Sequence, residues 1–193
     1  MKVAKRTIMS LLAALCLGMS ACATTPMTAS QIQDQRQEVR DMADQTLAKV
    51  YGNYPTARSE IERSAGYAVF SNFGFKFLFM GSSRGEGVAI NTTTKQQTFM
   101  KMFELSPGLG FGAQKFACVF IFETKAALES FVNSGWEFGG STAAALQTST
   151  QGVGGRLGAN VSPGVTMYQV SETGAIVGIS LTGAKYYKDD ELN

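Results

Sequence analysis

Apolar side chains recur at helical spacing between Ser30 and Val50, with Gln, Asp, Arg and Glu on the opposite face. Thr28 and Gln31 have the spacing of a capping box at the start of this helix. The run from Gly52 to Pro55 is expected to end it. A second, short helix is predicted over residues 56–65, with Gly66 as the glycine that follows its C-terminus.

From Gly66 onward the pattern changes to short apolar and aromatic runs separated by Gly, Ser, Asn and Thr. A helix is expected only near residues 125–134, where Thr124 suits an N-cap and Gly135 a stop. We predict strands at residues 67–72, 75–80, 87–91, 97–103, 111–123, 136–147, 165–170 and 175–183, with a hairpin turn at 171–174. The expected fold class is α+β: N-terminal helices packed on a twisted antiparallel β-sheet or small β-barrel, with one further helix near 125–134.

The first residues have the layout of an export signal. Three cations among the first six residues precede an uncharged apolar stretch, residues 7–17, that is too short to cross a bilayer. The sequence Met19-Ser20-Ala21-Cys22 resembles a bacterial lipobox, in which the cysteine is acylated and becomes the new N-terminus. Ala23 follows the cysteine, and by resemblance to enterobacterial lipoprotein sorting this residue indicates the outer membrane. The alternative is an ordinary signal peptide cleaved near Ala21 or Ala23, which leaves Cys22 as a free thiol.

This pattern divides the chain into four segments. Residues 1–21 are the predicted lipoprotein signal peptide, and residues 22–28 form a short polar tether. Residues 29–65 are a helical lead-in, and residues 66–193 form a β-rich domain. We expect the lead-in and the β-rich domain to make one globular unit, because the mature chain is long enough for one core.

Composition argues against several classes of function. Of the 17 basic residues in the chain three lie in the leader, which leaves 14 against 15 acidic residues, so no nucleic-acid partner is expected. The chain contains no histidine, which removes Ser-His-Asp and Cys-His catalysis and histidine-ligated zinc. Cys118 lies in an apolar run, where a buried small side chain is expected rather than a reactive thiol. We therefore expect no catalytic residues, no metal, no cofactor and no enzyme.

Other motifs in the sequence bear on this expectation. Residues 108–113 match the letters of a dinucleotide fingerprint, but no helix is predicted after them, so we expect a flexible or bulged start to a buried strand. Residues 152–158 lack the Lys-Ser or Lys-Thr of a phosphate-binding loop and are expected to be a surface loop. Glu104, Glu123 and Glu137 leave a carboxylate hydrolase as a minor alternative. The final residues, 188–193, are expected to be a solvated tail.

The β-rich region resembles the SYLF domain, a lipid-binding domain also described as actin-bundling. The residues that carry the resemblance are 65–70 (AGYAVF), 81–88 (GSSRGEGV), 111–114 (FGAQ) with the strand and helix after them, and 171–184 (SETGAIVGISLTGA). It covers about residues 55–190 and implies a non-catalytic module that binds membranes or a protein partner. In some eukaryotic relatives a basic amphipathic helix contacts phosphoinositides. Here residues 31–50 carry four acidic and three basic side chains, so attraction to anionic lipid should be weak.

The leading hypothesis is therefore an envelope lipoprotein, anchored through acylated Cys22 and residing at the outer membrane, whose SYLF-like domain binds phospholipid or scaffolds a protein partner. The candidate lipid contact is the aromatic stretch formed by Phe73, Phe75, Lys76 and Phe77. The alternative for these alternating rings is an ordinary core. A small apolar-ligand carrier, with its site in a β-barrel mouth, is the second hypothesis for the function.

Overall fold

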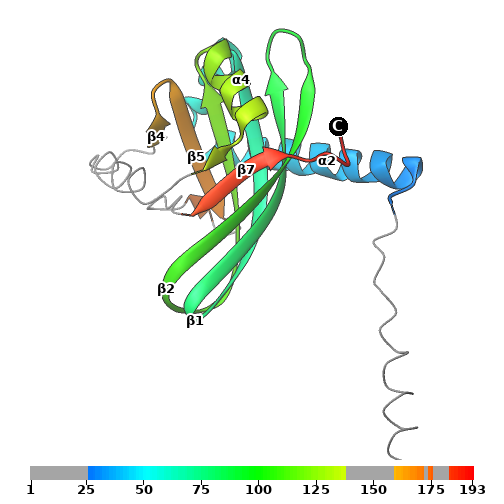
Figure 1. The fold of residues 1–193 in the computed structure, drawn as a ribbon. Helices are drawn as coiled ribbons and strands as arrows, with labels where there is room; N and C mark the ends of the chain where they lie inside the picture. The colour runs from blue at the N-terminus through cyan, green and yellow to red at the C-terminus, as the bar shows by residue number, and fades with distance from the viewer. Residues whose placement is uncertain (1–25, 138–158, 172–173, 176–182) are drawn as a thin grey trace, which may run out of the picture.

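The computed structural model describes residues 26–137, 159–171, 174–175 and 183–193. In these ranges three helices accompany a curled, fully antiparallel sheet of seven strands (Figure 1). The helices are α2 (Ala29–Asn53), α3 (Ala57–Arg63) and α4 (Lys125–Ser134). The strands are β1 (Gly66–Asn91), β2 (Gln97–Phe122), β3 (Trp136–Glu137), β4 (Ala159–Ser162), β5 (Val165–Ser171), β6 (Gly174–Ala175) and β7 (Ala184–Lys188). The predicted α+β class and antiparallel sheet are confirmed.

The helix ends follow from their capping residues. The Thr28 hydroxyl accepts the Gln31 amide at 3.4 Å, and the Gln31 side chain accepts the Thr28 amide at 2.8 Å, so the predicted capping box is present. Thr124 likewise accepts the Ala127 amide at 3.2 Å, and Gly135 ends α4 with a φ of 66°. One prediction was wrong, because α3 ends at Arg63 with an extended Ser64, and Gly66 is already a strand residue.

Three of the predicted strands, at 67–72, 75–80 and 87–91, are parts of the single 26-residue strand β1. Residues 97–103 and 111–122 likewise belong to one strand, β2, whose middle includes residues 108–113. The two strands pair from Gly66 with Phe122 to Ile90 with Gln97, with one irregularity between Leu78 and Met80. The ribbon that they form bends back on itself and projects from the rest of the molecule (Figure 1). No helix follows residues 108–113, so the dinucleotide fingerprint is excluded.

Strand β2 organises the sheet because its two ends pair with different strands. Its first part pairs with β7, from Met100 opposite Lys188, and its last part pairs with β5, from Phe116 opposite Ser171. Short strands extend these edges, since β3 pairs with β7 and β4 with β5. Ser171 of β5 pairs with Gly174 of β6, whereas residues 172–173 of the predicted hairpin turn lie outside the described residues. The predicted strands 136–147 and 175–183 lie largely outside the described residues, as does the glycine-rich segment 152–158.

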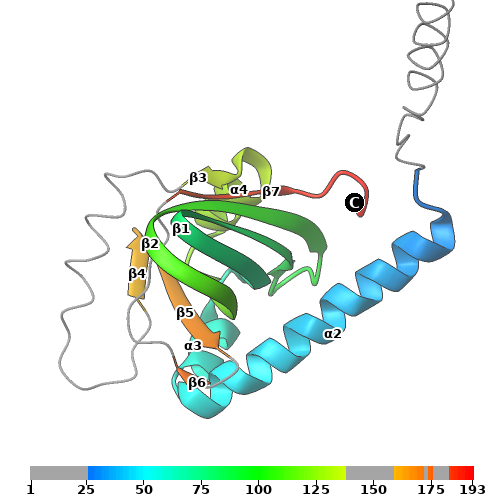
Figure 2. The same cartoon turned by 90° about the horizontal axis from the view of Figure 1, so that it is seen from below.

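The two faces of the sheet have separate cores. One core contains aromatic rings of β1, β2, α4 and β7, among them Phe70, Phe120, Phe131 and Tyr186. Phe70 and Tyr186 have ring centroids 4.8 Å apart in an edge-to-face arrangement. The other core joins Val39, Leu47 and Val50 of α2 to Val69, Val119 and Tyr168 of the sheet. Figure 2 shows α4 and α2 on opposite sides of the curled sheet.

The predicted solvated tail is wrong for its last residues. Asp189 and Leu192 are buried, at 2% and 1% exposure, between α2 and β2. The Arg36 side chain donates to the Leu192 carbonyl at 2.7 Å, and the Asn193 side chain pairs with both backbone groups of Phe99. Leu192, an apolar residue within a charged sequence, therefore connects the N-terminal half of α2 to the sheet. None of the helices in the described ranges has the length and hydropathy needed to cross a bilayer.

Candidate functional site

Glycines allow the two arms of β1 to lie against each other. A Cβ atom at Gly87 would stand 2.4 Å from the Val69 carbonyl oxygen, and one at Gly85 would stand 2.7 Å from the Ser71 carbonyl oxygen. Side chains cannot be accommodated at such distances without backbone movement. Both glycines belong to the segment 81–88 that suggested the family resemblance, so that motif specifies the close approach of two strand arms.

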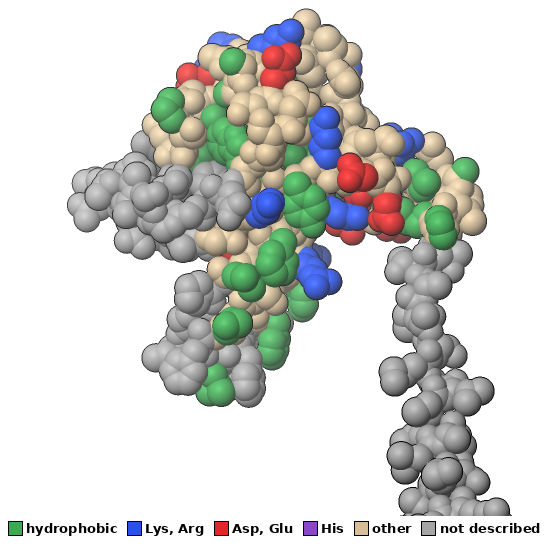
Figure 3. Space-filling model, in the orientation of Figure 1, with side chains coloured by type: hydrophobic (Ala, Val, Ile, Leu, Met, Phe, Trp, Pro, Cys, Tyr) green, Lys and Arg blue, Asp and Glu red, His purple; other side chains and the backbone are tan. Residues whose placement is uncertain are grey.

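The fold-back exposes apolar side chains at the projecting end of the ribbon. Phe73 and Phe75 are 59% and 55% exposed, and they are joined there by Leu78, Met80 and Leu105, at 40%, 68% and 48%. Figure 3 shows these side chains gathered over the projecting part of the molecule, with Lys and Arg beside them. Neither Phe73 nor Phe75 is a core residue, so the ordinary-core alternative is wrong for both. The side chains of Lys76 and Phe77 lie outside the described set.

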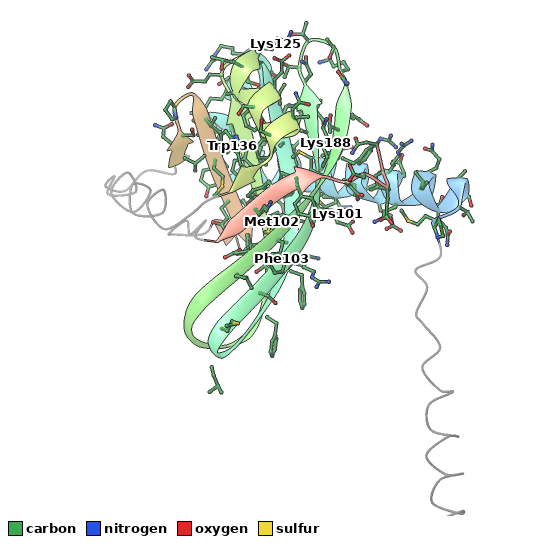
Figure 4. The ribbon with its side chains drawn as sticks, viewed as in Figure 1. Lys101, Met102, Phe103, Lys125, Trp136 and Lys188 are labelled. Atoms are coloured by element: carbon green, nitrogen blue, oxygen red, sulfur yellow. The ribbon has the colours of Figure 1, made fainter. Side chains whose placement is uncertain are left out.

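A mixed row of side chains crosses the sheet between this apolar end and α2. Phe103 pairs with Arg84 of β1 on one side and with Lys185 of β7 on the other. In the next row Lys101 pairs with Glu86 and with Tyr187. Figure 4 shows Lys101, Met102 and Phe103 in succession along β2, close to where β7 crosses the ribbon. The face that continues from the apolar end therefore carries both aromatic and charged groups.

Lys101 is held by two carboxylates. Its Nζ lies 2.9 Å from Asp189 Oδ1 and 3.2 Å from Glu191 Oε2. Desolvation acts to lower the pKa of Lys101, but the hydrogen bonds to Asp189 and Glu191 outweigh it, and the pKa is raised. The Lys101 charge is thus already compensated within the protein and is engaged in holding the final residues of the chain.

A cavity of about 730 Å³ lies where α2 leaves the sheet, next to the exposed ring of Phe73. Its apolar wall includes Val39, Met42, Phe73 and Phe103, and its charged groups are Arg84, Lys101, Glu38 and Glu86. Arg84 and Glu38 form no hydrogen bond or ion pair with any residue that the structure describes. Glu86 accepts a hydrogen bond from the Gln35 side chain at 3.2 Å. The cavity therefore holds one uncompensated cation beside two carboxylates.

Glu104 and Glu123, two of the three glutamates of the hydrolase alternative, are not brought together. Glu104 is buried at 7% exposure, and it lies on the opposite face of the sheet from Lys101 and Phe103. Glu123 is exposed and borders a different cavity beside α3, with Glu60 and Tyr168. The Glu137 side chain lies outside the described set. Within the described residues no cluster of three or more His, Cys, Asp or Glu side chains offers a metal site.

Cys118 is buried as expected. Burial raises the pKa of its thiol to about 12, against the weaker opposing effect of hydrogen bonds from Tyr186 and Asn72. The Asn72 Nδ2 atom lies 3.9 Å from the sulfur. A thiol in this state is not a nucleophile at neutral pH.

Comparison with known proteins relates the sequence to one family. Residues 103–193 match the family model Ysc84, described as "Las17-binding protein actin regulator". The chain contains a Ysc84 (SYLF) domain. Beta cell expansion factor A of Aeromonas veronii is 33% identical over 165 residues, which are 83% of this chain and 59% of that protein. The chain thus spans less than two thirds of the length of this relative, and the family model begins inside β2, at Phe103.

Sequence reasoning identified the aromatic stretch 73–77 but missed Leu78, Met80 and Leu105, which share its exposed end. It also missed the cavity beside α2 and the pairing of Phe103 with Arg84 and Lys185. These relationships depend on the bend in the β1–β2 ribbon. A signal existed in the glycine spacing of residues 81–87, which is unusual for a flat strand.

Proposed function

We propose that this protein is a non-catalytic, lipid-anchored envelope protein, residing at the outer membrane, whose Ysc84 (SYLF) domain binds the membrane surface. Acylated Cys22 supplies the anchor, and the projecting end of the β1–β2 ribbon supplies the domain's own contact. The family's description concerns an actin regulator and the relative's name concerns β-cell expansion, so neither specifies a lipid. The proposal therefore depends on the chemistry of the exposed surface.

The observation that carries it is the set of exposed apolar side chains at one projecting end, headed by Phe73 and Phe75. Soluble proteins rarely gather large apolar side chains on one exposed surface without a partner for them. Aromatic rings beside Lys and Arg are typical of groups that insert at the boundary between lipid head groups and acyl chains. A bilayer fits this end better than a small ligand does, because the end projects and is not concave.

Flotation with vesicles tests the domain's contribution. The chain from residue 22 onward, produced without its leader and hence unacylated, should float with phospholipid vesicles. The double variant Phe73→Ser/Phe75→Ser should remain folded and lose flotation. Absence of flotation of the unsubstituted protein on every lipid would show that the acyl chains do all the anchoring. The domain would then face a protein partner.

The anchor has a separate test. Growth with radiolabelled palmitate should label the protein, and Cys22→Ser should abolish the label and release the protein from membranes. Processing that is unchanged in Cys22→Ser, with no label in either form, would support an ordinary signal peptide.

The small apolar-ligand carrier is the second candidate. The cavity beside α2 supports it, since ligand sites have volumes of about 300–1,000 Å³ and the observed volume lies within that range. Its charged lining, however, suits a ligand with a polar head. Native mass spectrometry of the purified protein distinguishes the two, because a carrier retains its ligand in the absence of vesicles.

A further inference from the structure

The charges of the cavity beside α2 are of both signs and are fixed by strand geometry. Arg84 and Glu86 are two residues apart on β1, so they share a face and their Cα atoms lie about 7 Å apart. Glu38 reaches the same cavity from α2. Lys101 is compensated by Asp189 and Glu191, so the free charges are one guanidinium and two carboxylates.

This arrangement does not suit an anionic head group. A phosphate alone would pair with Arg84 but would lie close to Glu86 and Glu38, and like charges at such distances oppose binding. A phosphate that carries a primary ammonium group satisfies all three side chains. Its phosphate oxygens accept hydrogen bonds from the planar guanidinium, which can bind a phosphate in a bidentate manner. Its ammonium group donates hydrogen bonds to the carboxylates.

The surroundings of the cavity indicate that such a head group would arrive on a lipid. Phe73 belongs both to the cavity wall and to the exposed apolar end, so a head group in the cavity lies directly beside the surface proposed to enter the bilayer. Val39, Met42 and Phe103 supply apolar wall beyond the charged groups. One lipid molecule could therefore have its head group at Arg84 and Glu86 while its acyl chains remain in the membrane.

We infer that the cavity between α2 and the β1–β2 ribbon is a binding site for the phosphoethanolamine head group of a membrane lipid, with Arg84 holding the phosphate and Glu86 and Glu38 holding the ammonium. The inference rests on the proposed function, because it requires that the apolar end reach the bilayer. It adds a preference for a zwitterionic lipid with a primary amine over an anionic one.

The test compares vesicles of phosphatidylcholine alone with vesicles that contain, in equal fraction, added phosphatidylethanolamine or added phosphatidylglycerol. Phosphatidylethanolamine should increase the bound fraction of the unacylated protein. The quaternary ammonium of choline has no N–H to donate to a carboxylate, and phosphatidylglycerol has no ammonium. Arg84→Gln and Glu86→Gln should each lower the partition coefficient on the phosphatidylethanolamine vesicles by about three- to tenfold. Glu86→Gln should not change binding to phosphatidylcholine, because the quaternary ammonium of choline gives that carboxylate no N–H to accept.

Matched controls exist on α3, away from the cavity. Arg63→Gln and Glu62→Gln remove the same charges there and should leave all three partition coefficients unchanged. Free phosphoethanolamine should reduce binding to phosphatidylethanolamine vesicles, whereas inorganic phosphate should not.

Two results would overturn the head-group site alone: a larger increase with phosphatidylglycerol than with phosphatidylethanolamine, or an unchanged phosphatidylethanolamine increment in Arg84→Gln. Failure of the unsubstituted protein to bind any vesicle would contradict the proposed function as well. The two failures are therefore distinguishable in one set of measurements.

Discussion

Gly87 lies so close to Val69, eighteen positions earlier in the same strand, that a Cβ atom on the glycine would stand 2.4 Å from the valine carbonyl oxygen. The ring of Phe70 is equally near, with its Cδ1 atom at 2.4 Å. Because the Val69 oxygen is a backbone atom, a side-chain rotation cannot relieve its clash with a Cβ atom at position 87. The fold-back of β1, and with it the projecting apolar end, depends on this spacing.

Replacement of Gly87 by alanine should therefore destabilise the domain, by about 1–3 kcal/mol or more, since overpacking of a fixed site has this cost. Gly52→Ala is the control, because nothing lies within 4 Å of a Cβ at that position in α2. It should be neutral or stabilise by up to about 1 kcal/mol. Urea unfolding followed by circular dichroism measures both. Equal stabilities of the two variants would contradict the close approach of the two arms.

The helices of this chain could be predicted from sequence because their signals are local. Thr28 with Gln31 and Thr124 with Gly135 fixed three helix ends to within a residue, through contacts that span at most a few positions. Two predicted boundaries were less accurate, namely the C-terminal ends of α2 and α3. The helix α2 continues through Gly52 to Asn53, because a single glycine near a helix end costs less than the burial of Val50 and Tyr54 gives.

The strands were harder to predict, because pairing between distant residues joins several short predicted strands into the two long strands β1 and β2. Glycine and serine at 81–87 look like turn residues, yet Gly81, Gly85 and Gly87 are paired residues within β1. Alternating aromatics usually face a core, but Phe73 and Phe75 lie at the projecting end of the ribbon and are more than half exposed. Leu192 in a charged run gave no local sign that it fills a position beneath α2. The exposure of these rings and the burial of Leu192 depend on the bend of the ribbon and on the length of α2, which are not local features of the sequence.

Substitution of the buried and of the exposed phenylalanines on β1 should change the free energy of unfolding by very different amounts. Phe70 is fully buried and makes edge-to-face contacts with Phe120, Phe131 and Tyr186, so Phe70→Ala should cost about 3–5 kcal/mol. Phe73→Ser and Phe75→Ser should each change the free energy of unfolding by less than about 1 kcal/mol, because more than half of each side chain is exposed. Thermal unfolding of the three variants is the measurement. A large loss of stability in either serine variant would mean that these rings pack against part of the protein.

Cys118 should make the domain sensitive to alkali. Burial raises the pKa of its thiol to about 12, whereas the thiol of the unfolded chain ionises near pH 9. Between these values the folded state keeps a proton that the unfolded state has lost, so the free energy of unfolding falls as pH rises. One such group contributes about 1.4 kcal/mol per pH unit.

The check is a pair of unfolding titrations between pH 7 and pH 10, for the unsubstituted protein and for Cys118→Ala. The stability advantage of the unsubstituted protein should shrink as pH passes 9. Tyr186, whose pKa burial raises well above its ordinary value, adds a further decline only above pH 10. A constant difference between the two proteins across this range would argue that the thiol is not shielded from water.

The ion pair of Lys101 with Asp189 should show an asymmetry between its partners. Asp189 is 2% exposed and Lys101 is 31% exposed in their side chains. Removal of the lysine in Lys101→Met leaves a buried carboxylate whose remaining contact is the Glu191 amide, at 3.1 Å. Loss of one partner of a buried pair is strongly destabilising, and here we expect about 2–3 kcal/mol. Asp189→Asn should cost less, because the asparagine oxygen still accepts the Glu191 amide and the lysine can turn to water.

Glu191→Gln completes the series. Glu191 is 55% exposed and lies 3.2 Å from Lys101, so loss of its charge should cost at most about 1 kcal/mol. Urea unfolding should thus rank the losses as Lys101→Met, then Asp189→Asn, then Glu191→Gln. If Glu191→Gln matched Lys101→Met, the buried carboxylate would not be the costly element. The same ranking should appear in protease sensitivity near Arg36, since the segment that contains Asp189 also carries Leu192, whose carbonyl holds the Arg36 side chain on α2.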